Sequence, residues 1–534
     1  MEIPFCGPTY NGRSLNVDAS RSVNFYLELT GTTDNKAQMI MVGTPGLQIF
    51  TANIATNWNV VARGLYSFNG VLWAVVGNTL YSGATGGIFT SRGTLATTTG
   101  RVSFSNNGLG SMSAGTGGNQ LIIVDGTSGY LYNVVTSTFS TIASSAGWAD
   151  LIASGGPKQV EFIDGYFVVT NGTQAFWVSD LYDGTTWQAL ATATVSATPD
   201  TIQSLINHRQ QIFYIKQYST ELWFDTGTTD TTQGSPLARQ SGAVYDYGTS
   251  APWSVAKGGQ SFYFLCNTRT GDGGEFLGVA EVTDYTPVMV STPAIAYRIS
   301  QSTTLANCFG YCYADQGHIF YVLTNPDDNW TLVYDAATKM WHERSSLTTS
   351  TGAVNRHLGN CYSFFNGKHY VGDYRSSAIY EMSAAYYSDF GNPIYSFRTA
   401  QTIQDANMRD NVFISKLVID AETGVGNSTN LPTATIPYPA GWSGSSNVLI
   451  KADGSITAGA ILLSAANPQA MLDWSDDGGH TWSNQYPKAL GVSGAYTTRL
   501  VWTRLGKARD RVFRVCMHDN VKKVLINAFI EGAL

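Results

Sequence analysis

The sequence predicts an all-β protein that consists of a β-propeller of about seven blades and a C-terminal β-sandwich. Only 13% of the 534 residues are charged, and Glu and Lys are scarce, which disfavours helices. Hydrophobic residues make up 43% of the chain, which is enough to bury a large core and argues against disorder. A strand–turn–strand pattern also recurs along most of the chain, whose length exceeds that of one ordinary core.

The repeat consists of a turn with Gly or Asn, a short hydrophobic strand, a second turn and a strand that ends in an aromatic residue. Seven copies start about 50 residues apart, a period typical of four-stranded propeller blades. We expect each copy to supply the second and third strands of a blade, and one blade to combine both ends of the chain. An array of β-sandwiches is the alternative, but it gives no reason for a constant period. The copies are residues 69–83, 119–133, 164–177, 209–224, 259–277, 316–334 and 366–380.

The rhythm of the sequence divides the chain into three parts. Residues 1–50 precede the first repeat and are expected to form an N-terminal arm. Residues 51–394 contain the repeats and are assigned to the propeller. From residue 395 the spacing changes, and a strongly alternating strand at 411–420 favours a β-sandwich over residues 395–534. A stretch rich in Ser, Thr, Asn, Gly and Pro, residues 424–457, is expected to be an insertion loop in that sandwich.

Two turn motifs stand out, and both are interpreted as structural. Residues 475–482 fit the Asp-box pattern S-x-D-x-G-x-T-W, in which Asp caps backbone amides, Gly takes a positive φ and Trp packs on the turn. Residues 334–341 resemble a kelch-type blade turn in which Trp packs between blades. The residues concerned are Ser475, Asp477, Gly479 and Trp482 in the first motif, and Asp335 and Trp341 in the second.

No catalytic, cofactor-binding or metal-binding residues are predicted. The seven histidines lack H-x-x-x-H spacing, and neither a G-x-S-x-G elbow nor a phosphate-binding G-x-x-x-x-G-K-[ST] loop occurs. Cys308 and Cys312 are four residues apart, but no second pair follows at zinc-ligand spacing, so we expect reduced and mostly buried thiols. The N-terminus shows no signal peptide, and no apolar run is long enough for a membrane helix.

One charge cluster stands out in a chain whose net charge is −7. Six basic residues fall within sixteen positions near the C-terminus, against one acid, Asp510. They form either a solvated strand face or a docking patch for an acidic partner or DNA phosphate. The cluster consists of Arg499, Arg504, Lys507, Arg509, Arg511 and Arg514.

Three segments together resemble the packaged-DNA stabilisation proteins of short-tailed phages, also called tail accessory factors or tail hub (nozzle) proteins. These segments are RSVNFY at 21–26 with GTPGL at 43–47, STELWF at 219–224 with SAP at 250–252 and the strand 261–265, and VWTRLGKARDRVFRV at 501–515. The similarity spans nearly the whole chain in order. The chain is longer than the resemblance implies, and the insertion at 424–457 is one reason.

The resemblance implies a structural virion protein of the phage tail, made in the host cytoplasm and without catalysis. It implies a homohexamer below the portal and its adaptor (the head-to-tail connector), extending the DNA channel, retaining the packaged genome and anchoring a tail needle or plug and tailspikes or fibres. Genomic DNA would pass without specific binding, since six copies at −7 each carry −42, which repels DNA. The alternatives are a glycan-active or glycan-binding propeller, either a sialidase-like hydrolase or a lectin, and a kelch-type cellular scaffold.

Overall fold

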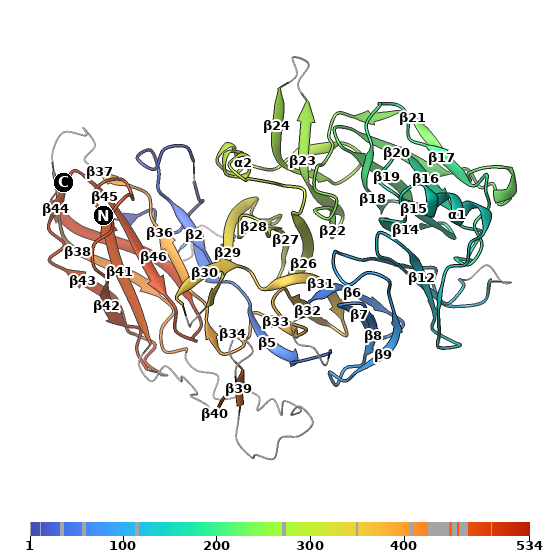
Figure 1. The fold of residues 1–534 in the computed structure, drawn as a ribbon. Coiled ribbons are helices and arrows are strands. Elements are labelled where there is room, and N and C mark those ends of the chain that lie inside the picture. Colours follow the sequence, from blue (N-terminus) through green and yellow to red (C-terminus); the bar gives the residue numbers. More distant parts are fainter. Residues whose placement is uncertain are drawn as a thin grey trace.

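The computed structural model confirms the all-β class, the propeller and the C-terminal β-sandwich (Figure 1). The described residues contain two short α-helices, α1 (Ala146–Ala153) and α2 (Pro293–Ser300). The structure describes residues 2–10, 12–31, 37–55, 60–112, 117–269, 274–348, 351–404, 411–425, 448–450, 456–458, 468–492 and 494–533. The expected insertion loop at 424–457 lies almost wholly outside these residues.

Six blades of the propeller are each built from four consecutive antiparallel strands. The first three blades are β6 (Ala62–Phe68), β7 (Val71–Val76), β8 (Thr79–Gly83) and β9 (Phe89–Thr94); β10 (Ser103–Asn106), β11 (Gln120–Val124), β12 (Gly129–Asn133) and β13 (Thr138–Thr141); and β14 (Gln159–Ile163), β15 (Tyr166–Thr170), β16 (Ala175–Val178) and β17 (Thr192–Thr194). The next three are β18 (Ile202–His208), β19 (Gln211–Lys216), β20 (Thr220–Asp225) and β21 (Leu237–Tyr245); β22 (Ala256–Gly258), β23 (Ser261–Arg269), β24 (Glu275–Val282) and β25 (Pro287–Met289); and β26 (Phe309–Asp315), β27 (His318–Asn325), β28 (Trp330–Asp335) and β29 (Met340–Thr348).

A composite sheet closes the ring. It contains β31 (Gly359–Phe365), β32 (Lys368–Asp373) and β33 (Ile379–Ser383), and its fourth strand is the N-terminal β5 (Gly46–Thr51), which pairs antiparallel with β33. The short strands β34 (Ser388–Asp389) and β35 (Asn392–Pro393) extend this sheet. The N-terminal β5 and the last strands of the propeller segment therefore share one sheet, and the six blades of consecutive strands differ slightly from the expected number of about seven.

Each of the seven sequence repeats supplies the second and third strands of its sheet, as predicted. The turns between first and second strands explain why the repeat is visible in the sequence. In the first of these turns, φ is 53° at Asn69 and 66° at Gly70. In the last, φ is 47° at Asn366 and 75° at Gly367. Positive φ at both central residues defines the tight hairpin turn that Asn-Gly favours. Between neighbouring sheets, apolar side chains form continuous clusters, so each blade buries its faces against the next.

The sandwich contains two sheets that enclose one hydrophobic core, with Phe5, Leu417, Trp502 and Phe513 among its buried members. One sheet has the order β3-β4-β46-β38-β43, with β1 and β44 at its margins. The other has the order β36-β45-β41-β42, with β37 beside β45. The strands are β1 (Glu2–Ile3), β3 (Phe25–Leu29), β4 (Met39–Gly43), β36 (Ser396–Thr399), β37 (Ile403–Gln404), β38 (Val412–Ala421), β41 (Gln469–Ser475), β42 (Tyr486–Ala489), β43 (Leu500–Thr503), β44 (Lys507–Ala508), β45 (Asp510–Met517) and β46 (Val524–Ala533). A separate hairpin consists of β39 (Val448–Ile450) and β40 (Ile456–Ala458).

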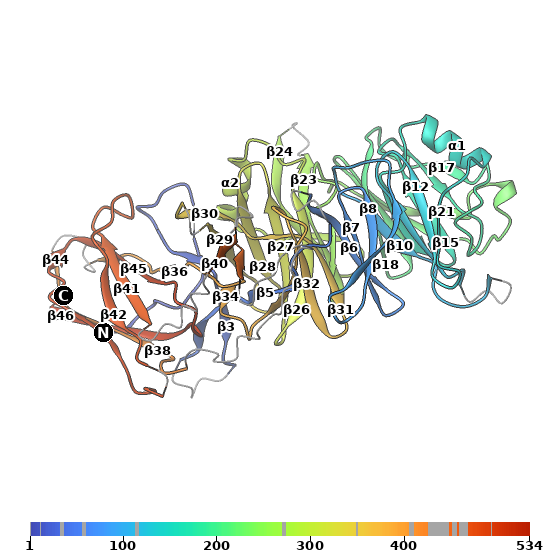
Figure 2. The same ribbon diagram turned by 60° about the horizontal axis from the view of Figure 1, so that its bottom comes forward.

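One sheet runs continuously from the propeller into the sandwich. The strand β2 (Arg21–Val23) pairs with β29 of the sixth blade on one side and with β36 of the sandwich on the other, while β30 (Ala353–Arg356) pairs with β29. Side chains reinforce this junction: Arg21 forms a bidentate ion pair with Glu343 at 2.7 and 2.8 Å, and Asn24 donates to the carbonyl oxygens of Ser345 and Tyr395. Figure 2 shows the sandwich beside the propeller, with both chain termini on the sandwich. The N-terminal segment therefore joins the two domains.

The cysteines agree with the sequence-based expectation. All six cysteines are free and buried, as predicted, and burial raises the pKa of Cys6 and Cys516 to about 11. In the part of the chain that the structure describes, no helix has the length and apolar character that crossing a membrane requires.

Candidate functional site

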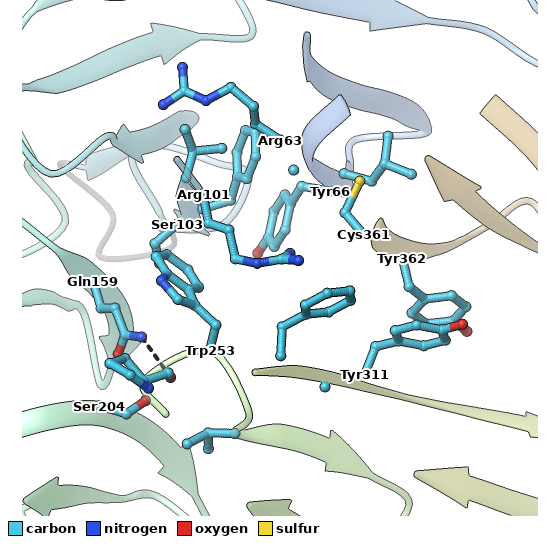
Figure 3. A pocket seen from close by; sticks show the side chains of 18 of the residues that line it. Arg63, Tyr66, Arg101, Ser103, Gln159, Ser204, Trp253, Tyr311, Cys361 and Tyr362 are labelled. Atoms are coloured by element: carbon cyan, nitrogen blue, oxygen red, sulfur yellow. Dashed lines mark hydrogen bonds between the residues drawn. The ribbon is translucent and has the colours of Figure 1, made fainter. Parts of the chain in front are cut away.

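A cavity of about 240 Å³ lies at the centre of the propeller (Figure 3). Its walls come from the innermost strands β6, β10, β14, β18, β26 and β31, or from residues next to them, and from the segment before β22. Most lining residues belong to the first half of each inner strand, as in residues 63–66 of β6 and 309–311 of β26. The cavity therefore lies towards the propeller face at which the inner strands begin.

Polar side chains in this cavity connect blades that are not neighbours. Gln159, from the third blade, donates to the Pro252 carbonyl oxygen at 3.0 Å and accepts from the Leu205 amide at 3.2 Å. Arg101 donates to both oxygens of Asn360, in β31, and so reaches past the first blade. These contacts hold the ring closed from within.

The charged side chains that line the cavity, Arg63, Arg101 and Glu161, differ in how far hydrogen bonds and burial affect them. Arg63 donates to the carbonyl oxygens of Gly100 and Gly77 at 2.6 and 2.8 Å, and the residue is 2% exposed. Burial lowers the pKa of Arg101 to about 9, and burial raises the pKa of Glu161 to about 7. Among the described lining residues Glu161 is the single carboxylate, whereas glycoside hydrolysis usually needs two.

The predicted basic cluster separates into two parts. Arg511 is 3% exposed and pairs with Asp476 at 2.6 and 2.7 Å, and Arg514 pairs with Asp473 at 2.9 and 2.5 Å. Both arginines therefore form ion pairs with carboxylates of the sandwich. The other four side chains, Arg499, Arg504, Lys507 and Arg509, are exposed around β43 and β44. These four are the exposed members of the cluster, and Arg509 also pairs at the surface with Asp510 at 2.9 Å.

The Asp-box residues form the turn that follows β41. Asp477 accepts hydrogen bonds from the amides of His480 and Thr481 at 2.9 Å and from the Ser475 hydroxyl at 2.6 Å. These bonds hold the pKa of Asp477 below its ordinary range. Gly479 has a φ of 98°, and the Trp482 ring lies 3.9 Å from the Arg514 guanidinium. The motif thus supports the Arg514–Asp473 pair.

Replacing Arg514 by glutamine tests this internal role. The substitution leaves the Asp473 carboxylate, which is 1% exposed, without its cation. We expect the free energy of unfolding to fall by about 2 kcal/mol in chemical denaturation, because a buried charge without a partner is costly. Arg509→Gln is the matched control, since the Arg509 side chain is 69% exposed, and it should change stability by less than about 0.5 kcal/mol. Equal losses in both variants would contradict the division of the cluster.

The second turn motif lies in the sixth blade. Asp335 accepts from the Thr338 hydroxyl and from His318 Nδ1, both at 2.7 Å, and the hydrogen bond with Asp335 raises the pKa of His318. Trp341 donates from its indole nitrogen to the Val290 carbonyl oxygen at 3.1 Å and packs in the apolar cluster between the fifth and sixth blades. Both residues stabilise contacts within and between blades.

The described residues contain no group of three or more His, Cys, Asp or Glu side chains arranged to hold a metal ion. The two turn motifs and the buried part of the basic cluster thus form turns, ion pairs and contacts between blades. The central cavity has no contiguous sequence motif, because its walls come from seven separate parts of the chain.

Fold and site together define an all-β protein in which a β-propeller and a β-sandwich are joined by a shared sheet. Two family models match the chain: "Bacteriophage P22 Gp10, beta-propeller" over residues 1–387 and "Bacteriophage P22 Gp10, beta-sandwich" over residues 450–533. The chain belongs to the bacteriophage P22 Gp10 family, and it is a structural component of the phage virion tail. Among curated proteins, none matches this sequence.

Solved structures with similar architecture are distant in sequence. The N-terminal domain of Nup159 is 10% identical, with 68% of this chain and 99% of that chain covered and a TM-score of 0.37. YCF48 from Cyanidioschyzon merolae is 13% identical, with coverage of 64% and 100% and a TM-score of 0.37. AFV00434, an ancestral GH74 enzyme, is 10% identical, with coverage of 71% and 54% and a TM-score of 0.38. These TM-scores are too low to carry an argument about function.

Proposed function

We propose that six copies of this chain form a ring below the portal and its adaptor, and that the packaged DNA passes between the copies. The single observation that supports this most directly is the filled centre of the propeller. Its cavity of about 240 Å³ corresponds to roughly eight water molecules at about 30 Å³ each. A DNA duplex, whose major groove alone is about 12 Å wide, cannot enter it. A conduit for DNA then has to be lined by several subunits.

The charge of the chain fits a conduit that does not bind DNA tightly. Six copies at −7 each carry −42, and a wall of this sign repels the DNA backbone. In this proposal the ring extends the channel, retains the genome after packaging and performs no catalysis. It also anchors a tail needle or plug and the tailspikes or fibres.

The exposed part of the basic cluster is the proposed docking patch, which we define as Arg499, Arg504, Lys507 and Arg509. It lies on the sandwich, away from the propeller, and contrasts with the low charge of the rest of the chain. An acidic surface on another tail protein fits it best, because a basic patch steers acidic partners and sets their orientation. Tight DNA binding by this patch would conflict with a conduit along which DNA moves.

Native mass spectrometry of the chain mixed with the adaptor ring of the same phage tests this function. We expect six copies per adaptor ring, and no retention of duplex DNA by the assembly at physiological salt. A triple charge reversal, Arg504→Glu, Lys507→Glu and Arg509→Glu, should weaken binding of one acidic tail partner, the adaptor, the needle or the fibre, when each is tested separately.

The matched control is Arg239→Glu, which changes an exposed arginine on β21 of the propeller and should leave every partner interaction intact. A stoichiometry other than six, or tight binding of duplex DNA, would overturn the proposed ring. Unchanged binding of all three partners by the triple variant would remove the docking patch but leave the ring in place.

A further inference from the structure

The Arg101 guanidinium projects into the central cavity of the propeller, and Figure 3 shows it among Tyr66, Trp253 and Cys361. Its Nη1 donates to the Asn360 carbonyl oxygen at 2.7 Å and its Nη2 to Asn360 Oδ1 at 3.0 Å. The charge also lies 3.6 Å from the centroid of the Phe309 ring. All of these contacts are with neutral groups.

Arg101 therefore holds a positive charge that the protein does not neutralise. In the part of the chain that the structure describes, no ion pair joins it to a carboxylate, and its charge interacts with the Cys361 thiol and with a second cation, Arg356. Burial lowers the pKa of Arg101 to about 9, so that the side chain remains mostly protonated at neutral pH. An uncompensated charge in a cavity is costly, and such charges are concentrated at binding sites.

The size and lining of the cavity limit what can neutralise this charge. A volume of about 240 Å³ is slightly below the range of about 300–1,000 Å³ that is common for drug-sized ligands. Trp253, Phe309 and Tyr311 contribute aromatic rings to one part of the wall, against which a planar ring can pack. Glu161 lines the same cavity and repels a second negative charge, which disfavours dianions such as phosphate.

We propose that the central cavity of the propeller binds a small organic monocarboxylate, with the carboxylate on the Arg101 guanidinium and the apolar body against the aromatic wall. Guanidinium and carboxylate match in shape and charge, and the bond gains strength where water is excluded. The site is separate from the docking patch and does not depend on ring assembly.

Isothermal titration calorimetry of the dialysed full chain at pH 7.5 and constant ionic strength tests this proposal, with sodium benzoate as the probe and sodium phosphate for comparison. Benzoate should bind with one site per chain, and phosphate at least tenfold more weakly. Arg101→Gln should weaken benzoate binding at least about tenfold, which is the effect of losing a charged hydrogen-bond donor. Glu161→Gln should strengthen it, because a repelling charge is removed.

Arg509→Gln is the control and should bind benzoate as the unchanged chain does. Because Arg101 also contacts Asn360, thermal unfolding without ligand will show whether Arg101→Gln still folds; Glu161→Gln gives a readout of opposite sign that does not depend on that result. The proposal is overturned if benzoate shows no saturable binding below about 10 mM, if Arg101→Gln folds and keeps its affinity, or if phosphate binds as well as benzoate.

Discussion

Replacing Lys216 by methionine is expected to lower the free energy of unfolding by about 3–5 kcal/mol. Lys216 and Glu221 are both 0% exposed, and their Nζ and Oε1 atoms are 2.7 Å apart in the fourth blade. Lys216 also contacts Asp200 at 3.1 Å. Methionine keeps the apolar length of the side chain but leaves two carboxylates without their cation. Urea denaturation followed by circular dichroism measures the loss.

The size of this effect depends on burial, and two further variants test that dependence. Lys368→Met removes a cation at a similar distance, 2.8 Å, from Glu381, but Lys368 is 52% exposed, so a loss below about 1 kcal/mol is expected. Combining Lys216→Met with Glu221→Leu should recover part of the stability, since no fully buried charge then remains at this pair. Similar losses for Lys216→Met and Lys368→Met would show that the pair in the fourth blade is not a buried ion pair in solution.

Replacing Leu47 by alanine is expected to lower the free energy of unfolding by about 2–5 kcal/mol. Leu47 lies in β5, the N-terminal strand that completes the last sheet of the propeller, and is 1% exposed. It packs in the apolar cluster that contains Tyr26, Val371 and Tyr380, so the truncation leaves a cavity where the ring closes. Thermal unfolding and limited proteolysis should both detect a weakened closure.

Leu29→Ala is the matched control, because Leu29 also lies in an N-terminal strand, β3 of the sandwich, and is 51% exposed. It should change stability by less than about 0.5 kcal/mol. Leu47→Met conserves volume and should cost less than about 1.5 kcal/mol. If Leu47→Ala were as stable as Leu29→Ala, the packing of β5 would not contribute to the stability of the closed ring.

The repeat could be predicted from the sequence because its signal is local. Asn69-Gly70 and Asn366-Gly367 show their turn chemistry in two adjacent residues, and the hydrophobic runs beside them match the second and third strands. The outer strand β9 is not part of the sequence repeat, and its residues are mostly exposed. Strands with little buried surface give little hydrophobic periodicity.

The division of the basic cluster could not be predicted, because it depends on residues distant in sequence. Asp473 and Asp476 precede Arg514 and Arg511 by 41 and 35 residues, and only the pairing of β41 with β45 brings them together. The same holds for the central cavity, whose Arg101 and Asn360 are 259 residues apart. Sequence patterns report on local geometry, whereas these sites are products of ring closure.

The sheet that joins propeller and sandwich has a consequence for how the chain is made. The ribosome releases β1 and β2 first, yet β1 pairs with β46 at Phe529 and β2 pairs with β36 at Thr399. At about 5–20 residues per second, synthesis separates Glu2 from Phe529 by roughly 30–100 s. During that time β1 has no partner, so the final topology forms only after translation ends. In the nascent chain, the unpaired N-terminal strand β1 therefore has to be kept from pairing with other chains until β46 has been synthesised.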